Sequence, residues 1–239
     1  MIPARSDPER DAVASCWERS GGKLLRLDRF WEPPELDRTQ VRLYGHDTFC
    51  LVVAQKLNLG LLSPPDDLLV QVDPKWLQRE VRLSTLGSLE TFPVFVKPLV
   101  PKAFRAGVYA DRCQLDRECA GLEATTPALV APPVTIAAEA RGFILDGKLL
   151  TCAIYEGEGS LAEASGLLSK IAAQALLPAT CVLDVALVEG KGWALLEANA
   201  AWGSGLNGCN PQQVVPCLAR ATYAMAIQKA QSGSEPSNS

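Results

Sequence analysis

The sequence predicts a mixed α/β (α+β) protein with a small N-terminal lobe and a larger β-rich part. The first ninety residues alternate helix-start signals with short apolar runs. From residue 93 onward, strand-like segments joined by tight turns replace that pattern. We therefore expect an α/β lobe over residues 1–90, a larger domain over 91–230, and a disordered Ser/Gly/Pro-rich tail over 231–239.

Composition fits an ordinary globular protein: 48% of the 239 residues are apolar and 21% are charged. The net charge of −4 and the absence of a Lys/Arg run argue against nucleic-acid partners. No apolar run approaches the ~20 residues that span a bilayer, and we expect no signal peptide and no membrane partner. The eight cysteines form no CxxC pair, which favours free thiols in the reducing cytoplasm. The oligomeric state stays open.

Helix caps and turns predict the elements of the N-terminal lobe. Pro8 follows capping side chains at the start of the first helix. Asp47 is expected to cap the second helix, with Gly60 just beyond its end. The predicted elements are a helix from residue 6 to 21, a strand over 23–30, a helix over 48–56 and a helical segment over 67–71.

Alternating apolar segments and hairpin turns predict the elements of the larger domain. Asp146-Gly147 and the EGKG run at 189–192 are typical of tight hairpins. The predicted strands cover 93–98, 104–109, 130–134, 142–145, 148–155, 181–188 and 193–198, and the predicted helices cover 111–123, 160–177 and 211–229.

The hairpin over residues 181–199 carries the most informative residues. Glu197 and Asn199 stand two positions apart, so their side chains point to the same face of a strand. The turn places Asp184 beside them. Three oxygen donors in this arrangement fit Mg²⁺ that bridges polyphosphate oxygens. The alternative is that all three are polar residues at strand ends.

Several cations could meet phosphate near this hairpin. Lys97 ends an apolar strand, where its ammonium would act as a point charge. Lys102 begins a loop and strand that could fold over the same phosphates. Arg141, two residues after Glu139, could clamp a phosphate or carboxylate with its guanidinium. The alternatives are exposed lysines and a surface ion pair between Glu139 and Arg141.

Three further features are compatible with a nucleotide cleft. The PPVTI run could offer the backbone groups of Val134, Thr135 and Ile136 to an adenine edge, with Val134 and Ile136 on either side of the ring. Arg79 and Arg82, near the lobe junction, could grip an acidic substrate or serve as linker charges. His46 is the only histidine, and a helix-start residue is the more ordinary interpretation than a general base.

Taken in order, these residues resemble the ATP-grasp superfamily of carboxylate–amine ligases. The similarity covers about residues 93–220 and is greatest to a small clade found in bacteria and their viruses. It implies an ATP-grasp fold, in which the N-terminal lobe precedes two α+β subdomains that enclose ATP. The residues that carry the resemblance are Lys97, Val134, Glu139, Arg141, Asp184, Glu197 and Asn199.

The resemblance implies an ADP-forming ligase that phosphorylates a carboxylate and lets an amine, which could belong to a peptide or protein, displace the phosphate. Lys97 and Arg141 would be catalytic, and ATP would also contact Lys102, residues 134–136 and Glu139. Mg²⁺ would be held by Asp184, Glu197 and Asn199. Many family members carry an arginine where this chain has Val182. A phosphotransferase and a nucleotide-binding module without turnover are the alternatives.

Overall fold

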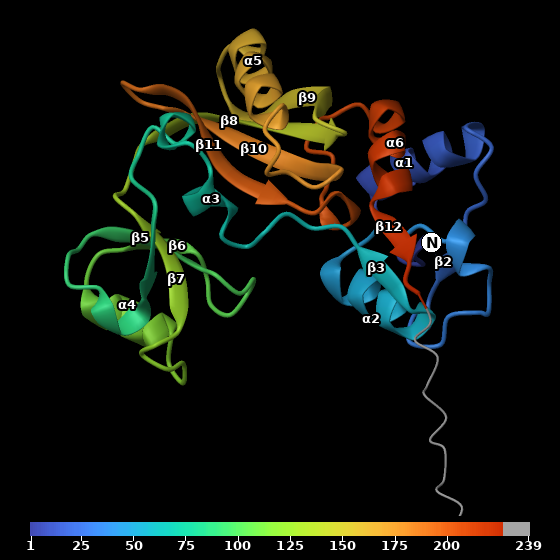
Figure 1. The fold of residues 1–239 in the computed structure, drawn as a ribbon, viewed down its shortest axis with the longest axis horizontal. Coiled ribbons are helices and arrows are strands. Elements are labelled where there is room, and N and C mark those ends of the chain that lie inside the picture. Colours follow the sequence, from blue (N-terminus) through green and yellow to red (C-terminus); the bar gives the residue numbers. More distant parts are fainter. Residues whose placement is uncertain (227–239) are drawn as a thin grey trace, which may run out of the picture.

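Three groups of elements form an arch in the computed structural model, which describes residues 1–226 (Figure 1). A four-stranded sheet spans the middle, a smaller four-stranded sheet lies at one end, and the N-terminal lobe lies at the other. The chain mixes helices with antiparallel sheets, so the predicted α+β class is confirmed. The tail predicted over 231–239 lies outside the described residues.

The central sheet has the strand order β11-β10-β8-β9, and all its pairs are antiparallel. Both predicted hairpin turns are present. Asp146 and Gly147 have φ values of 45° and 75°, and Gly190 has a φ of 71°, which suits these residue types. The strands are β8 (Ile136–Leu145), β9 (Lys148–Gly157), β10 (Thr180–Val188) and β11 (Gly192–Asn199).

Helix α5 (Leu161–Ala172) covers the outer face of the central sheet (Figure 1). Its Ser160 cap accepts a hydrogen bond from the Glu163 N–H. The side chains of Ala164, Leu168 and Ile171 follow helical spacing and are fully buried against this face. The inner face is left for the N-terminal lobe and for a cleft.

The smaller sheet has the order β4-β7-β5-β6 and packs one face against helix α4 (Arg112–Glu118). In β5, Val94 and Val96 point into this core, whereas Lys97 lies on the other face. The strands are β4 (Arg82–Thr85), β5 (Val94–Pro98), β6 (Gly107–Tyr109) and β7 (Pro127–Ala131). How the chain divides into domains at residue 90 stays a prediction.

The N-terminal lobe combines the start and the end of the described chain, shown blue and red in Figure 1. Helix α6 (Pro211–Arg220) packs against α1 (Pro8–Arg19), and β12 (Thr222–Ala224) pairs with β3 (Leu59–Leu61). The remaining elements are α2 (Asp47–Leu57), α3 (Leu68–Gln71), and the two-residue strands β1 (Ile2–Pro3) and β2 (Arg26–Leu27). Among residues 1–226, no helix has both the length and the apolar character needed to cross a membrane.

Local chemistry explains the differences from the predicted elements in the N-terminal lobe. The predicted strand over 23–30 is only two residues long. His46, not Asp47, caps α2, because its Nδ1 accepts the Phe49 N–H at 3.2 Å. Asn58 ends the helix with a φ of 50°, so Gly60 is not its terminating residue and lies in β3.

Other differences arise where backbone donors are missing or tertiary pairing takes over. Strand β7 ends at Ala131 because Pro132 and Pro133 have no N–H to continue the ladder. The helix predicted over 211–229 ends at Arg220, where the chain turns into β12, and its last three residues lie outside the described part. The helices predicted over 111–123 and 160–177 and the strand over 104–109 are present but shorter. The short strands β1, β3, β4 and β12 were not predicted.

The inner face of the central sheet carries part of the N-terminal core. Val182 and Phe143 lie opposite each other on β10 and β8, and both are 0% exposed. They belong to the same apolar cluster as Leu43 and Trp202. The position where many family members have an arginine is therefore buried in apolar surroundings in this chain.

We expect Val182→Arg to lower the free energy of unfolding by about 3–5 kcal/mol, because it buries a charge without a partner. Denaturant titration measures the change. The matched control is Leu51→Arg on α2, where the side chain is 55% exposed; its effect should stay within about 0.5 kcal/mol. A Val182→Arg variant as stable as the original chain would show that this core opens readily.

Candidate functional site

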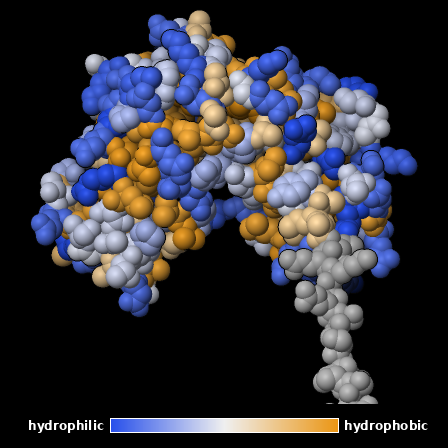
Figure 2. Space-filling view, viewed as in Figure 1, coloured by the Kyte–Doolittle hydropathy of each residue, from blue (hydrophilic) through white to orange (hydrophobic). Residues whose placement is uncertain are grey.

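A cleft lies between the two main sheets, below the central sheet. It comprises a cavity of about 390 Å³ and a neighbouring cavity of about 270 Å³, and both are lined by Lys97, Leu129 and Glu197. Figure 2 shows the molecule hollowed on this side, between the smaller sheet and the N-terminal lobe. The larger cavity also touches Pro64 and Pro65, which lie in the link between the N-terminal lobe and the smaller sheet.

One row of polar side chains crosses the floor of the cleft. Asp184 on β10 stands opposite Glu197 on β11 and opposite Arg141 on β8. Residues directly opposite each other in antiparallel strands share a face of the sheet. Asn199, two positions after Glu197, shares it as well. The structure thus brings the three predicted metal ligands together and adds Arg141 to them.

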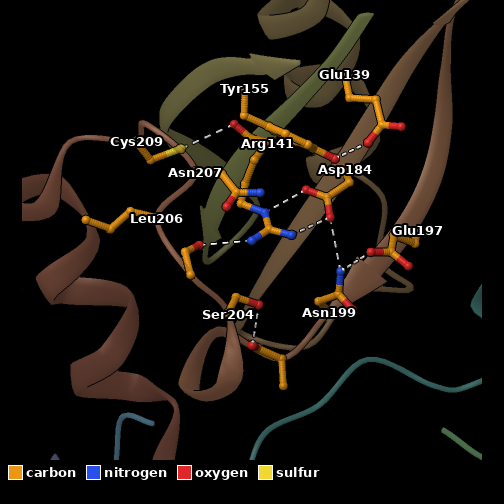
Figure 3. A network of polar contacts seen from close by, with 12 residues as sticks. Glu139, Arg141, Tyr155, Asp184, Glu197, Asn199, Ser204, Leu206, Asn207 and Cys209 are labelled. Atoms are coloured by element: carbon orange, nitrogen blue, oxygen red, sulfur yellow. Dashed lines mark hydrogen bonds and ion pairs between the residues drawn. The ribbon is translucent and has the colours of Figure 1, made fainter. Parts of the chain in front are cut away.

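Hydrogen bonds link this row into one network (Figure 3). Arg141 donates from Nε and Nη2 to the two oxygens of Asp184, at 2.8 and 2.7 Å. The Asn199 amide nitrogen lies 3.1 Å from Asp184 Oδ2 and 2.8 Å from Glu197 Oε1. Lys97 Nζ reaches across from the smaller sheet to Glu197 Oε2 at 2.8 Å. Two cations and two carboxylates therefore balance in charge.

Burial and pairing act in opposite directions on these charges. Burial raises the pKa of Asp184, which is 1% exposed, while Arg141 favours its ionised form. Burial would also raise the pKa of Glu197, but the nearby Lys97 lowers it below the usual range. Burial opposes the charge of Arg141, yet its hydrogen bonds to Asp184 raise its pKa overall. The four groups thus hold one another in their charged forms.

The donor set fits a magnesium ion. Carboxylate and amide oxygens are the ligands that Mg²⁺ prefers, and the Asn199 amide nitrogen already lies between the two carboxylates. Turning that amide by half a rotation would present its oxygen to a cation in this place. Within residues 1–226 no group of three His, Cys, Asp or Glu side chains could hold a metal, so the amide is essential to this set.

Glu139 lines the smaller cavity, but it does not form the ion pair with Arg141 that was the alternative interpretation. Its carboxylate instead accepts a hydrogen bond from the Tyr155 hydroxyl. The Arg141 guanidinium lies over the Tyr155 ring, 5.8 Å from its centroid. Nothing in the local sequence marks Tyr155, because its place in the site depends on the β8–β9 register.

The remaining predicted contacts are distributed unevenly around the cleft. Ile136 lines the smaller cavity, whereas Val134 and Thr135 lie in the link between β7 and β8. The Thr135 carbonyl accepts the Glu189 N–H at 3.0 Å, which fixes this link to the β10–β11 hairpin. Lys102 lines the larger cavity, but its ammonium pairs with Asp47 of the N-terminal lobe at 2.5 Å.

The structure separates the two arginines at the lobe junction. Arg79 lines the smaller cavity, and its Nη1 donates to the carbonyl oxygens of Leu77 and Leu195, both at 2.9 Å. Burial lowers its pKa, and within the described chain no carboxylate forms an ion pair with it. Arg82 is exposed on β4. Arg79 is therefore a cation of the cleft with spare N–H groups, which the sequence could not distinguish from a linker charge.

We expect Arg141→Met to destabilise the protein in a pH-dependent way, because Asp184 would stay buried without a cation. Its folded-state pKa would then lie well above the unfolded value of about 3.9, so stability would fall as the pH rises above that value. At about pH 7 the loss should reach roughly 3 kcal/mol. Denaturant titrations at several pH values measure it.

The control for that experiment is the double variant Arg141→Met/Asp184→Asn, in which no buried carboxyl is left to ionise. Its unfolding free energy should not show the decline with rising pH. A decline of equal size in both variants would mean that Asp184 is not its source.

A family model described as an ATP-grasp domain, family 2 of its clade, matches residues 76–217. The fold is shared with a RimK domain ATP-grasp protein from Sphaerobacter thermophilus, at 15% identity and a TM-score of 0.61, over 91% of this chain and 96% of that chain. D-alanine–D-alanine ligase from Bacillus anthracis gives 11% and 0.51, over 92% and 95%. ATP-grasp ligase PsnB, complexed with a phosphomimetic variant of its minimal precursor, Mg and ADP, gives 12% and 0.51, over 90% and 93%.

No curated protein is detectably similar to the chain in sequence. The family model nevertheless spans more than half of the 239 residues, and the cleft lies between two sheets of the matched region. The chain therefore belongs to this family of ATP-grasp domains.

Proposed function

We propose that this protein is an ATP- and Mg²⁺-dependent ligase that joins a carboxylate to an amine through an acylphosphate. The observation that carries the proposal is the single network of Lys97, Glu197, Asn199, Asp184 and Arg141 on the floor of one cleft. Phosphoryl transfer requires mainly positioning and charge neutralisation, and such a network supplies both without a protein nucleophile.

ATP would lie between the two sheets. Its base would use the smaller cavity, beside Ile136 and Glu139 and close to the link that holds Val134 and Thr135. Lys97 would exchange Glu197 for phosphate oxygens, and Arg79 would contribute a second cation from the same cavity. Lys102 would join them by releasing Asp47.

Asp184, Glu197 and Asn199 would hold Mg²⁺, which when bound neutralises charge on the transferring phosphate and on the leaving ADP. The loss of Lys97 from Glu197 would free one of the carboxylate oxygens for this role. Arg141 would keep Asp184 ionised and oriented.

Two steps follow from this arrangement. A carboxylate oxygen of the substrate attacks the γ-phosphorus, the bond from that phosphorus to the bridging oxygen of ADP breaks, and ADP leaves. The amine nitrogen then attacks the acyl carbon, the carbon–oxygen bond to phosphate breaks, and the nitrogen releases a proton to solvent. The chain's cations stabilise the charge that develops on the phosphoryl oxygens in the first step.

A peptide is the acceptor class that we favour. The larger cavity is open between the link at Pro64 and Pro65 and the loop that carries Lys102 and Arg105, so both its walls are polar at the rim and apolar inside. The relative PsnB has been solved with a minimal precursor. All eight cysteines are free, which fits a protein of the reducing cytoplasm.

Incubation with ATP, Mg²⁺ and pooled amino acids and peptides should release ADP and phosphate together with a new amide, detected by mass spectrometry. Glu197→Gln should lower kcat by more than about a hundredfold, because a direct metal ligand matters more than the outer partners that cost 10–100-fold. Glu189→Gln, in the exposed hairpin turn between the same two strands, is the matched control and should keep full activity.

The products decide between the alternatives. AMP and pyrophosphate would contradict the acylphosphate route. A stable phosphorylated compound without an amide would indicate a phosphotransferase. Tight nucleotide binding without turnover, and unchanged by Glu197→Gln, would indicate a binding module.

Arg79→Met should raise the KM for ATP about tenfold while changing kcat little, because it removes one charge-assisted contact that is present throughout the reaction. Arg82→Met is the matched control three residues away, on an exposed strand position, and should leave both constants unchanged. Equal effects of the two substitutions would mean that Arg79 acts only through the general charge of the junction.

A further inference from the structure

A carboxylate from the first helix holds the loop that follows the metal-ligand strand. Glu9, in the first turn of α1, accepts the Leu206 N–H on Oε2 at 2.8 Å and the Asn207 N–H on Oε1 at 2.9 Å. Two consecutive backbone N–H groups aimed at one anion form a nest, and such hydrogen bonds to a charged acceptor are stronger than neutral ones. The partners are separated by 197 and 198 positions in the chain.

Gly205 is required for this approach. A Cβ atom added at Gly205 would lie 2.8 Å from Glu9 Oε2, closer than such atoms come in real structures. The flexible loop predicted after Asn199 from its glycines is therefore held firmly at this point. Its other end is fixed as well, because the Tyr44 hydroxyl donates to the Ser204 carbonyl at 3.1 Å.

The same loop contacts Arg141 at two points (Figure 3). The Gly205 carbonyl accepts a hydrogen bond from Arg141 Nη1 at 3.0 Å, and the Cys209 thiol donates to the Arg141 carbonyl oxygen at 3.3 Å. The guanidinium therefore uses one edge for Asp184 and its remaining nitrogen for the loop. Its orientation depends on both partners.

We propose that Glu9 is a positioning residue: by fixing the loop at Leu206 and Asn207 it orients Arg141, and through Arg141 it orients Asp184. This inference rests on the proposed function. Glu9 lines neither cavity of the cleft, so it acts on the site from outside. The N-terminal lobe thereby sets the geometry of groups that lie on the central sheet.

Two variants break this contact from opposite sides. Glu9→Gln keeps the size of the side chain but turns an N–H group toward one of the loop donors, and Gly205→Ala displaces the carboxylate without changing charge. Each should lower kcat about 10–100-fold, and the KM for ATP should stay within about twofold. The double variant should be no worse than the poorer single variant, because both remove one contact.

Hydrogen exchange provides a readout that is independent of turnover. In both variants the amides of Leu206 and Asn207 should exchange at least about tenfold faster, while protection in the core strands is retained. Glu18→Gln, on the exposed side of the same helix, is the matched control and should change neither exchange nor activity.

Additive effects in the double variant, or unchanged exchange at Leu206 and Asn207, would overturn the inference. Loss of protection throughout the chain would overturn it too, because Glu9 would then serve stability alone. If the original chain shows no turnover, the proposed function fails, and exchange is judged together with the affinity for ADP and Mg²⁺. An affinity lowered about tenfold in both variants would support positioning, and an unchanged affinity would refute it.

Discussion

The buried pair of Arg141 and Asp184 is the interaction on which the site depends. A carboxylate that is 1% exposed is costly to bury, and the bidentate guanidinium on the neighbouring strand offsets that cost. Asp184 then orients Asn199, Asn199 orients Glu197, and Glu197 holds Lys97 of the opposite sheet. The pair therefore links the central sheet to the smaller sheet, and a ligand that takes Lys97 away would alter the charge balance of the whole row.

Strand periodicity and hairpin chemistry were sufficient to predict the local part of this site. Asp184, Glu197 and Asn199 lie on two strands joined by a short turn, so their proximity follows from the sequence between residues 181 and 199. Lys97 was predicted from its place at the end of an apolar strand. The two hairpins and the α+β class were predicted for the same reason, because short-range turn signals determine them.

Features that depend on contacts between distant segments could not be predicted. Arg141 meets Asp184 only because β8 and β10 pair in a particular register after a connection through β9 and α5. Arg79 differs from Arg82 only in which cavity its backbone position faces. The same applies to the role of Val182 in the N-terminal core and to Glu9, whose partners lie almost at the other end of the chain.

The pairing of β3 with β12 has a consequence for how the protein is made. Leu61 leaves the ribosome early in synthesis, but its partner Thr222 is among the last residues of the described chain to emerge. The apolar surface that α6 and β12 cover in the finished N-terminal lobe must therefore wait, unprotected, while the two sheets are being translated. A lobe that begins the chain is thus completed last, and its exposed intermediates are natural clients for chaperones.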